Sequence, residues 1–189
     1  MGIFDNLLMV VRIGLTVSTN SQCKLKGYDK GWFFARDVDF GASNLSSVGE
    51  TTESDTGSVK FDILKIEKDV DSCSPQLLSA CCKGGNLKLV EIHFVQTFYR
   101  TETGENSQPG GVSPVFIARF EEMNLSEWTI DSGKDSAIPK ETIKLDYQKV
   151  AIGWVNQTNG SVIGRGWERT EDGKPIAWNY QFKARGRNA

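Results

Sequence analysis

The sequence has little histidine and little cysteine, and these two shortages limit the metal and redox chemistry open to the protein. Among its 189 residues there are one histidine, His93, and four cysteines. The cysteines are Cys23, Cys73, Cys81 and Cys82, and no two of them have the C-x-x-C spacing of a zinc or redox site. Few ligands remain for a Cys/His metal site, so we expect neither a metal nor a cofactor. We interpret the four cysteines as reduced thiols, with packing the expected role of Cys81 or Cys82.

Long apolar runs and a strong excess of positive charge are also missing. No segment approaches the ~20 apolar residues that cross a bilayer, so stable membrane insertion is not expected. Residues 1–6 carry no positive charge and the short apolar run Leu7–Val11 ends at Arg12, unlike a cleaved export signal. We therefore expect a protein made in the cytoplasm, and secreted, if at all, without a signal peptide. The formal net charge of −2 argues against a nucleic-acid partner.

Motifs of common enzymes are missing too. The chain has no glycine-rich phosphate loop and no G-x-S-x-G nucleophile elbow. His93 lies in the middle of a predicted strand, where a structural or solvent-facing role is the ordinary one. Two acidic groups, residues 69 and 71 and residues 121 and 122, could supply a carboxylate pair, but we interpret them as strand-end and cap residues. We assign no catalytic residue and expect no enzyme.

Alternating apolar and polar residues dominate the sequence and indicate strands. Between residues 31 and 40, apolar Trp32, Phe34, Val38 and Phe40 alternate with a second set that includes Asp37. Further strand patterns cover residues 59–66, 88–100, 115–130 and 142–155, and residues 162–169 and 176–182 are predicted to form a terminal hairpin. With no repeat and no linker, the prediction is one domain over residues 1–189, mainly β, as a two-sheet β-barrel or sandwich.

One short helix is predicted over about residues 74–83. Ser72 or Ser74 would supply the N-cap oxygen, and Pro75 suits the first turn. The glycine pair at residues 84 and 85 would end the helix. A helix this short is stable only when it packs on other elements. Its expected anchors are Pro75, Leu77, Leu78 and Cys81.

The segment of residues 41–58 is predicted to be a long extended loop. It is rich in Ser, Thr and Gly, and Leu45 and Val48 are its only bulky apolar residues. Its only charges, Glu50, Glu53 and Asp55, are all negative. A polar loop of this length in a compact domain is usually functional or disordered.

Several segments resemble one known family. Residues 28–41, from Tyr-Asp-Lys-Gly-Trp to Phe-Gly, are similar to the early strand of Hcp (hemolysin-coregulated protein) family members, with Asp29 where the family has histidine. Residues 68–77 resemble the pattern Lys-x-x-Asp-x-x-Ser/Thr-Pro-x-Leu that opens the family's helix, and residues 80–84 resemble its end. Residues 138–150 match a later strand, and the Gly-Trp of residues 166–167 resembles the closing one. The resemblance covers about residues 28–170, and residues 171–189 add a terminal hairpin strand and a basic tail.

The resemblance implies a structural tube subunit of a bacterial type VI secretion system. Six copies would form a ring, and rings would stack into a secreted hollow tube that carries effector proteins. Besides further copies of itself, the implied partners are the secretion sheath, the baseplate, the spike protein and the effectors. Asp37 and Asp39 are expected to face the lumen, since strands form the channel wall in this family. The loop with Leu45, Val48, Glu50, Glu53 and Asp55 is expected to contact the next ring.

Other functions stay open at this point. A tail-tube protein of a phage, or of an extracellular contractile injection particle, would share the fold and the mechanics, and the sequence does not separate these from a secretion tube. A monomeric β-barrel that binds a small molecule is a further alternative from a different class. The oligomeric state in solution distinguishes this last alternative from the others.

Overall fold

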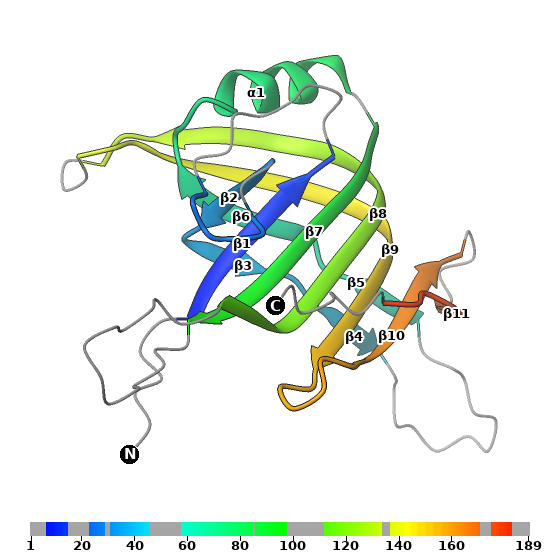
Figure 1. The fold of residues 1–189 in the computed structure, drawn as a ribbon. Helices are drawn as coiled ribbons and strands as arrows, with labels where there is room; N and C mark the ends of the chain where they lie inside the picture. Colours follow the sequence, from blue (N-terminus) through cyan, green and yellow to red (C-terminus); the bar gives the residue numbers. More distant parts are fainter. Residues whose placement is uncertain are drawn as a thin grey trace, which may run out of the picture.

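The computed structural model describes residues 7–14, 23–28, 31–45, 58–84, 86–97, 112–133, 137–170 and 175–182 (Figure 1). This part of the chain is mainly β with one helix, as predicted. Its elements, in chain order, are β1 (Leu7–Ile13), β2 (Trp32–Ala35), β3 (Asp37–Asp39), β4 (Ala42–Leu45), β5 (Ser58–Phe61), β6 (Leu64–Asp69), α1 (Ser74–Lys83), β7 (Asn86–Thr97), β8 (Val112–Asp131), β9 (Lys140–Val155), β10 (Val162–Arg169) and β11 (Pro175–Trp178).

The strand pairings, all antiparallel, enclose the core. One path runs β9–β8–β7–β1–β2, and a second path returns from β3 through β6 to β9. Because β3 follows β2 after a single residue, the two paths meet and the sheet curls into a barrel (Figure 1). Its interior is filled by a buried apolar cluster that includes Val11, Ile92, Phe120 and Leu145.

The predicted strand over residues 31–40 is two strands, and of the four apolar residues on its alternating face only Phe34 is exposed. The break is at Arg36, whose backbone N–H donates to the carbonyl oxygen of Glu67 at 2.7 Å, so the chain changes partner from β1 to β6. Phe33 is buried in the barrel, whereas Phe34 is 40% exposed. Trp32 is buried on the other face, in a second apolar cluster with residues 23–28. Trp32 and Phe34 share one face of β2, and only Trp32 is covered there, so alternation alone did not identify Phe34 as exposed.

Strand β9 divides the molecule, because its two halves have different neighbours. On one edge it pairs with β8 along most of its length. On the other edge, Lys140–Leu145 pairs with β6, whereas Lys149–Val155 pairs with β10. Beyond this point β10 and β11 continue the sheet as a hairpin away from the barrel, which confirms the predicted hairpin (Figure 1). Its predicted turn, residues 171–174, lies outside the described residues.

Helix α1 lies across one end of the barrel (Figure 1), and its bounds agree with the prediction. The helix ends at Gly84, which adopts a left-handed conformation with φ of 61° and is a residue type that tolerates it without strain. Within the described part of the chain, no helix is long and apolar enough to cross a membrane.

The predicted loop of residues 41–58 begins and ends as a strand pair. Strands β4 and β5 form a separate two-stranded sheet, with Ala42 opposite Phe61 and Leu45 opposite Ser58. Residues 46–57 lie outside the described residues, and with them Val48, Glu50, Glu53 and Asp55. The described part of this segment is thus a strand pair, which we call the β4–β5 arm.

Candidate assembly site

A buried ionic network joins the start of α1 to β9. The side chains of Lys68 and Glu141 are 1% and 0% exposed, and Lys68 Nζ lies 2.5 Å from Glu141 Oε1. Ser74 Oγ and Trp128 Nε1 also donate to the Glu141 carboxylate, each at 2.8 Å. Lys68 Nζ further contacts Asp71 Oδ1 at 3.0 Å. Charges this deeply buried are tolerated only when they are paired and hydrogen-bonded, as they are here.

Three groups in or beside this network have shifted pKa values. Burial lowers the pKa of Lys68, but the hydrogen bond to Glu141 and nearby negative charge outweigh it and raise the pKa above its ordinary value. Burial raises the pKa of Asp71, but hydrogen bonds from Cys73 and Lys68 outweigh it and lower the pKa. Burial, together with Asp71, raises the pKa of the Cys73 thiol to about 12. Cys73 is therefore a neutral structural thiol rather than a nucleophile.

The N-cap prediction for α1 was wrong. The cap residue is Cys73, which makes no side-chain cap hydrogen bond. Ser74 instead accepts a hydrogen bond from the backbone N–H of Asp71 at 2.9 Å and donates to Glu141. Asp71 in turn accepts one from the backbone N–H of Cys73 at 2.8 Å. The turn before the helix is thus held by the buried network.

The predicted helix anchors have different surroundings. Pro75 occupies the first turn, and Leu77 is 1% exposed within the barrel cluster. Cys81 is partly buried and packs against that cluster. Leu78, in contrast, is 42% exposed, so its prediction as an anchor was wrong. A ten-residue helix lying on one end of a barrel buries only one side, and Leu78 lies outside it.

The proposed lumen residues lie side by side on β3. Asp37 and Asp39 are exposed, and Val38 between them packs against the core. In the register between β3 and β6, Asp37 lies opposite Glu67 and Asp39 lies opposite Lys65. Both carboxylates thus share the outward side of this strand, and their position relative to a channel stays a prediction.

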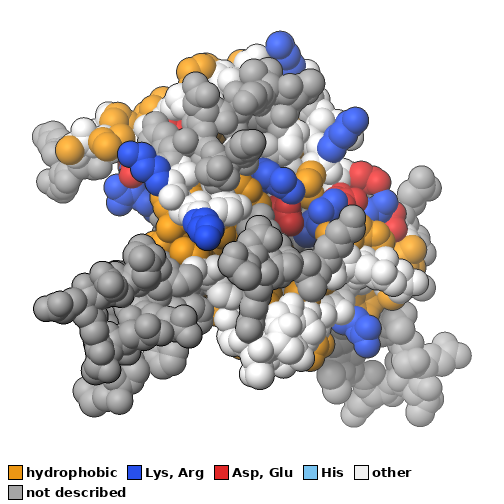
Figure 2. Space-filling model, viewed as in Figure 1, with side chains coloured by type: hydrophobic (Ala, Val, Ile, Leu, Met, Phe, Trp, Pro, Cys, Tyr) orange, Lys and Arg blue, Asp and Glu red, His pale blue; other side chains and the backbone are white. Residues whose placement is uncertain are grey.

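A charged stripe that the sequence analysis missed crosses the outer face of the barrel. It runs over β1, β7, β8, β9 and β10, where basic and acidic side chains lie close to one another (Figure 2). Arg12 pairs with Glu91, Arg119 Nη2 lies 2.6 Å from Glu121 Oε1, and Lys149 Nζ lies 3.3 Å from Glu168 Oε1. Arg119 and Glu121, two residues apart on one strand, were the only sequence pattern that indicated this stripe. The other pairs join different strands, so they are visible only once the strand register is known. The stripe consists of Arg12, Glu91, Arg119, Glu121, Lys149 and Glu168.

His93 is buried among aromatic and polar side chains. It is 2% exposed, its Nδ1 lies 3.0 Å from the hydroxyl of Tyr28, and its ring packs against the ring of Trp32. Its Nε2 lies 3.4 Å from Glu91 Oε1. Burial raises the pKa of Glu91, but His93 and Arg12 outweigh it and lower the pKa from 4.5 to about 2. Among the described residues no group of three or more His, Cys, Asp or Glu side chains could hold a metal ion.

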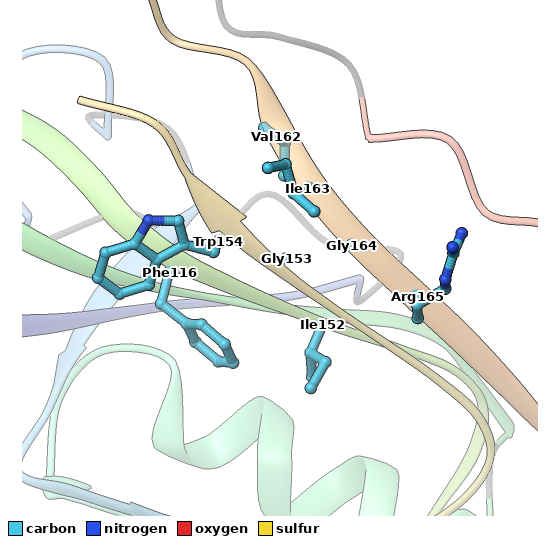
Figure 3. A pocket seen from close by; sticks show the side chains of 8 residues that line it. All are labelled: Phe116, Ile152, Gly153, Trp154, Val162, Ile163, Gly164 and Arg165. Atoms are coloured by element: carbon cyan, nitrogen blue, oxygen red, sulfur yellow. The ribbon is translucent and has the colours of Figure 1, made fainter. Parts of the chain in front are cut away.

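An open apolar hollow lies where the sheet leaves the barrel. It has a volume of about 560 Å³ and is lined by residues of β8, β9 and β10 (Figure 3). Trp154 is 57% exposed and Ile163, its cross-strand partner, is 72% exposed. Phe116, Ile152 and Arg165 complete its main lining. Exposed apolar area of this kind marks contact sites in folded proteins.

Comparison with known proteins identifies one family. The profile of the family described as "Type VI secretion system effector, Hcp" matches residues 22–154, a range that holds every member of the ionic network. A search of curated protein sequences gave no match.

Three solved structures of similar fold carry type VI secretion or Hcp names. A type six secretion system protein is 20% identical, with a TM-score of 0.67 over 90% of this chain and 100% of that one. Hcp1 from Salmonella typhimurium is 15% identical, with a TM-score of 0.63 over 89% and 98%. A type VI secretion system effector from Yersinia pestis is 14% identical, with a TM-score of 0.61 over 85% and 98%. At these identities the likeness establishes a shared fold.

Proposed function

The chain belongs to the Hcp family of type VI secretion proteins, and on that basis we propose that it is a structural tube subunit that forms homohexameric rings. The observation that carries the proposal is the family match over residues 22–154, which spans most of the barrel and the whole of α1. The buried network supports it, because Lys68, Asp71 and Ser74 of the helix-opening motif contact Glu141 or each other there. In this proposal the rings stack into a hollow tube that is secreted.

The proposed partners follow from that role. Copies of the chain contact each other within and between rings, and the tube contacts the sheath, the baseplate and the spike protein. Effector proteins travel in the lumen. We propose that Asp37 and Asp39 line this channel, because they share the polar side of β3. A structure of the assembled ring with both carboxylates on its outer circumference would contradict this assignment.

Light scattering and negative-stain microscopy of the purified protein test the function directly. We expect a particle of six copies, each of 20.9 kDa, and annular projections with a central hole. A monomer at micromolar to millimolar concentration would overturn the tube proposal and favour a ligand-binding barrel.

A further inference from the structure

We propose that neighbouring copies in the ring join head to tail, with the end of the β8–β9 hairpin of one copy seated in the apolar hollow of the next. This inference rests on the proposed ring and identifies the two surfaces that form it. It commits to one occupant of the hollow, a second copy of this chain.

The hollow is an uncovered continuation of the barrel core. Ile152 and Trp154 pair with Ala118 and Phe116 of β8, and these β8 residues pair in turn with the core strand β7. Their face is therefore the inward face of the barrel, extended onto β10 beyond the point where β6 stops pairing with β9. The burial of apolar surface that stabilises the barrel favours covering this face as well.

The opposite face of the same sheet is already covered by the chain itself. Phe182 lies over Gly153 and Gly164, where a Cβ on Gly164 would be 2.4 Å from the phenyl ring. Arg119 packs over the ring of Tyr180 at 4.8 Å. Tyr180 and Phe182 thus shield one side, whereas Trp154 and Ile163 on the other side are exposed.

The partner surface lies at the far end of the same two strands. The β8–β9 hairpin projects beyond the barrel, opposite β10 and β11, and carries hydrophobic side chains at its end (Figures 1 and 2). Ile130 is 50% exposed and Ile138 is 49% exposed. Along β8, Ile130 is separated from Phe116 by roughly 45 Å at the usual rise per residue. One copy cannot fill its own hollow, and the contact is between unlike surfaces, which is the kind that closes into rings.

The charges beside the two surfaces are complementary. Arg165 lines the hollow and Asp131 lies at the hairpin end, and both are exposed. Within the described part of the chain, neither forms an ion pair or side-chain hydrogen bond, although Lys140 lies opposite Asp131 on β9. A contact between Arg165 of one copy and Asp131 of the next would favour the head-to-tail orientation of the two copies, and would add little to the affinity.

A cross-linking experiment in the full chain tests the pairing. In a Cys82→Ser background, which removes the exposed cysteine among the described residues, one tagged copy carries Ile130→Cys and a second carries Ile163→Cys. The two are co-expressed and treated with oxidised glutathione. We expect disulfide-linked dimers that contain one copy of each. Co-expression of Ile130→Cys with Leu78→Cys is the matched control and should give none. Rings without the Ile130→Cys to Ile163→Cys link would overturn the inference.

A disruptive variant separates this inference from the ring proposal. Ile163→Asp should fold normally, because the side chain is exposed, but should raise the concentration needed for ring formation about tenfold or more, since the acid would be buried at the joint. Leu78→Asp, on the exposed side of α1, should assemble as the unaltered chain does. If the unaltered chain and Ile163→Asp form rings equally well, the head-to-tail joint is wrong and the ring proposal stands. If the unaltered chain is monomeric, the ring proposal itself fails.

Discussion

At the scale of single residues, the Lys68–Glu141 pair is the most consequential feature of the described structure. Both side chains are almost completely buried, and Phe33 lies under the ammonium group at 5.2 Å from the ring centre. Removing charges from water costs several kcal/mol per ion, and the pair offsets this only because the Glu141 carboxylate has three donors. The pair therefore acts mainly by holding β6, β8, β9 and the start of α1 in place relative to one another.

Removing one member of this pair should destabilise the fold strongly. Lys68→Met leaves a buried, unpaired carboxylate, and we expect a loss of about 3–5 kcal/mol in the free energy of unfolding, measured by urea denaturation. Adding Glu141→Leu should recover much of this loss, but not all, because Ser74 and Trp128 lose their acceptor.

Lys144→Met is the matched control for that series. Lys144 forms an exposed pair with Glu127, with side-chain exposures of 36% and 46%. Such pairs contribute about 0–1 kcal/mol, so its removal should change stability little. Equal losses for Lys68→Met and Lys144→Met would show that the buried network does not stabilise the fold.

Glu91 should make the protein sensitive to acid. Its pKa is about 2 in the folded protein, against an ordinary value of 4.5, because His93 and Arg12 stabilise the carboxylate more than burial disfavours it. A lowered pKa adds stability that is complete above 4.5 and is lost as the pH falls toward 2. Urea midpoints measured across this window should fall with pH, and Glu91→Gln should show a weaker fall. An unchanged pH slope in Glu91→Gln would assign the acid sensitivity to other groups.

At the scale of elements, α1 is held by one side only. Its length is too short for a stable isolated helix, so packing must supply its stability. Leu77 packs into the barrel cluster, whereas Leu78, its neighbour in sequence, is exposed. The two leucines therefore form a matched pair for testing how the helix is attached.

Leu77→Ala should cost about 2–5 kcal/mol in unfolding free energy, because it leaves a cavity under the helix. Leu78→Ala should change it by less than about 0.5 kcal/mol, as surface substitutions usually do. Thermal and urea unfolding of the two variants measure the difference. Similar losses for both would mean that the helix packs through a different side.

The local elements could be predicted from the sequence, but much of the site could not. The bounds of α1 were predictable, because Pro75 and Gly84 act on the backbone at the positions where they stand. Residues 31–40 were predicted as one strand, whereas Arg36 separates two strands with different partners, and Phe34 is exposed on the face where Trp32 is buried. Lys68 and Glu141 lie in strands, where charged residues ordinarily face water. Only the long-range pairing of β6 with β9 brings them together.

At the scale of the whole molecule, β9 separates a closed part from an open part. Its first half completes the barrel with β6, and its second half extends into the β10–β11 hairpin. The family match ends at residue 154, so both strands of that hairpin lie beyond it. The β4–β5 arm is a second projection, with its base held by pairing and its residues 46–57 outside the described residues. We propose that ring contact and ring stacking use separate surfaces, the β8–β10 hollow for the first and the β4–β5 arm for the second.

Shortening the arm tests this separation. Replacing residues 46–57 by a short Gly-Ser linker keeps the paired base, Ala42–Leu45 with Ser58–Phe61, so the barrel should remain folded. The only charged residues in the replaced segment are acidic, namely Glu50, Glu53 and Asp55. Salt would weaken the contacts of these acids with a neighbouring ring. The unaltered chain should therefore stack less as the salt concentration rises.

The shortened chain should still sediment as hexamers, because the hollow and the β8–β9 hairpin are unchanged. It should fail to form long tubes in negative-stain images, and it should not be secreted in a strain that depends on it. A linker of the original length with the three acids retained is the control, and it should restore stacking if charge rather than shape carries the contact. Normal tubes and normal secretion of the short-linker chain would show that the arm has no role in stacking, and would place the ring-to-ring contact on the barrel ends.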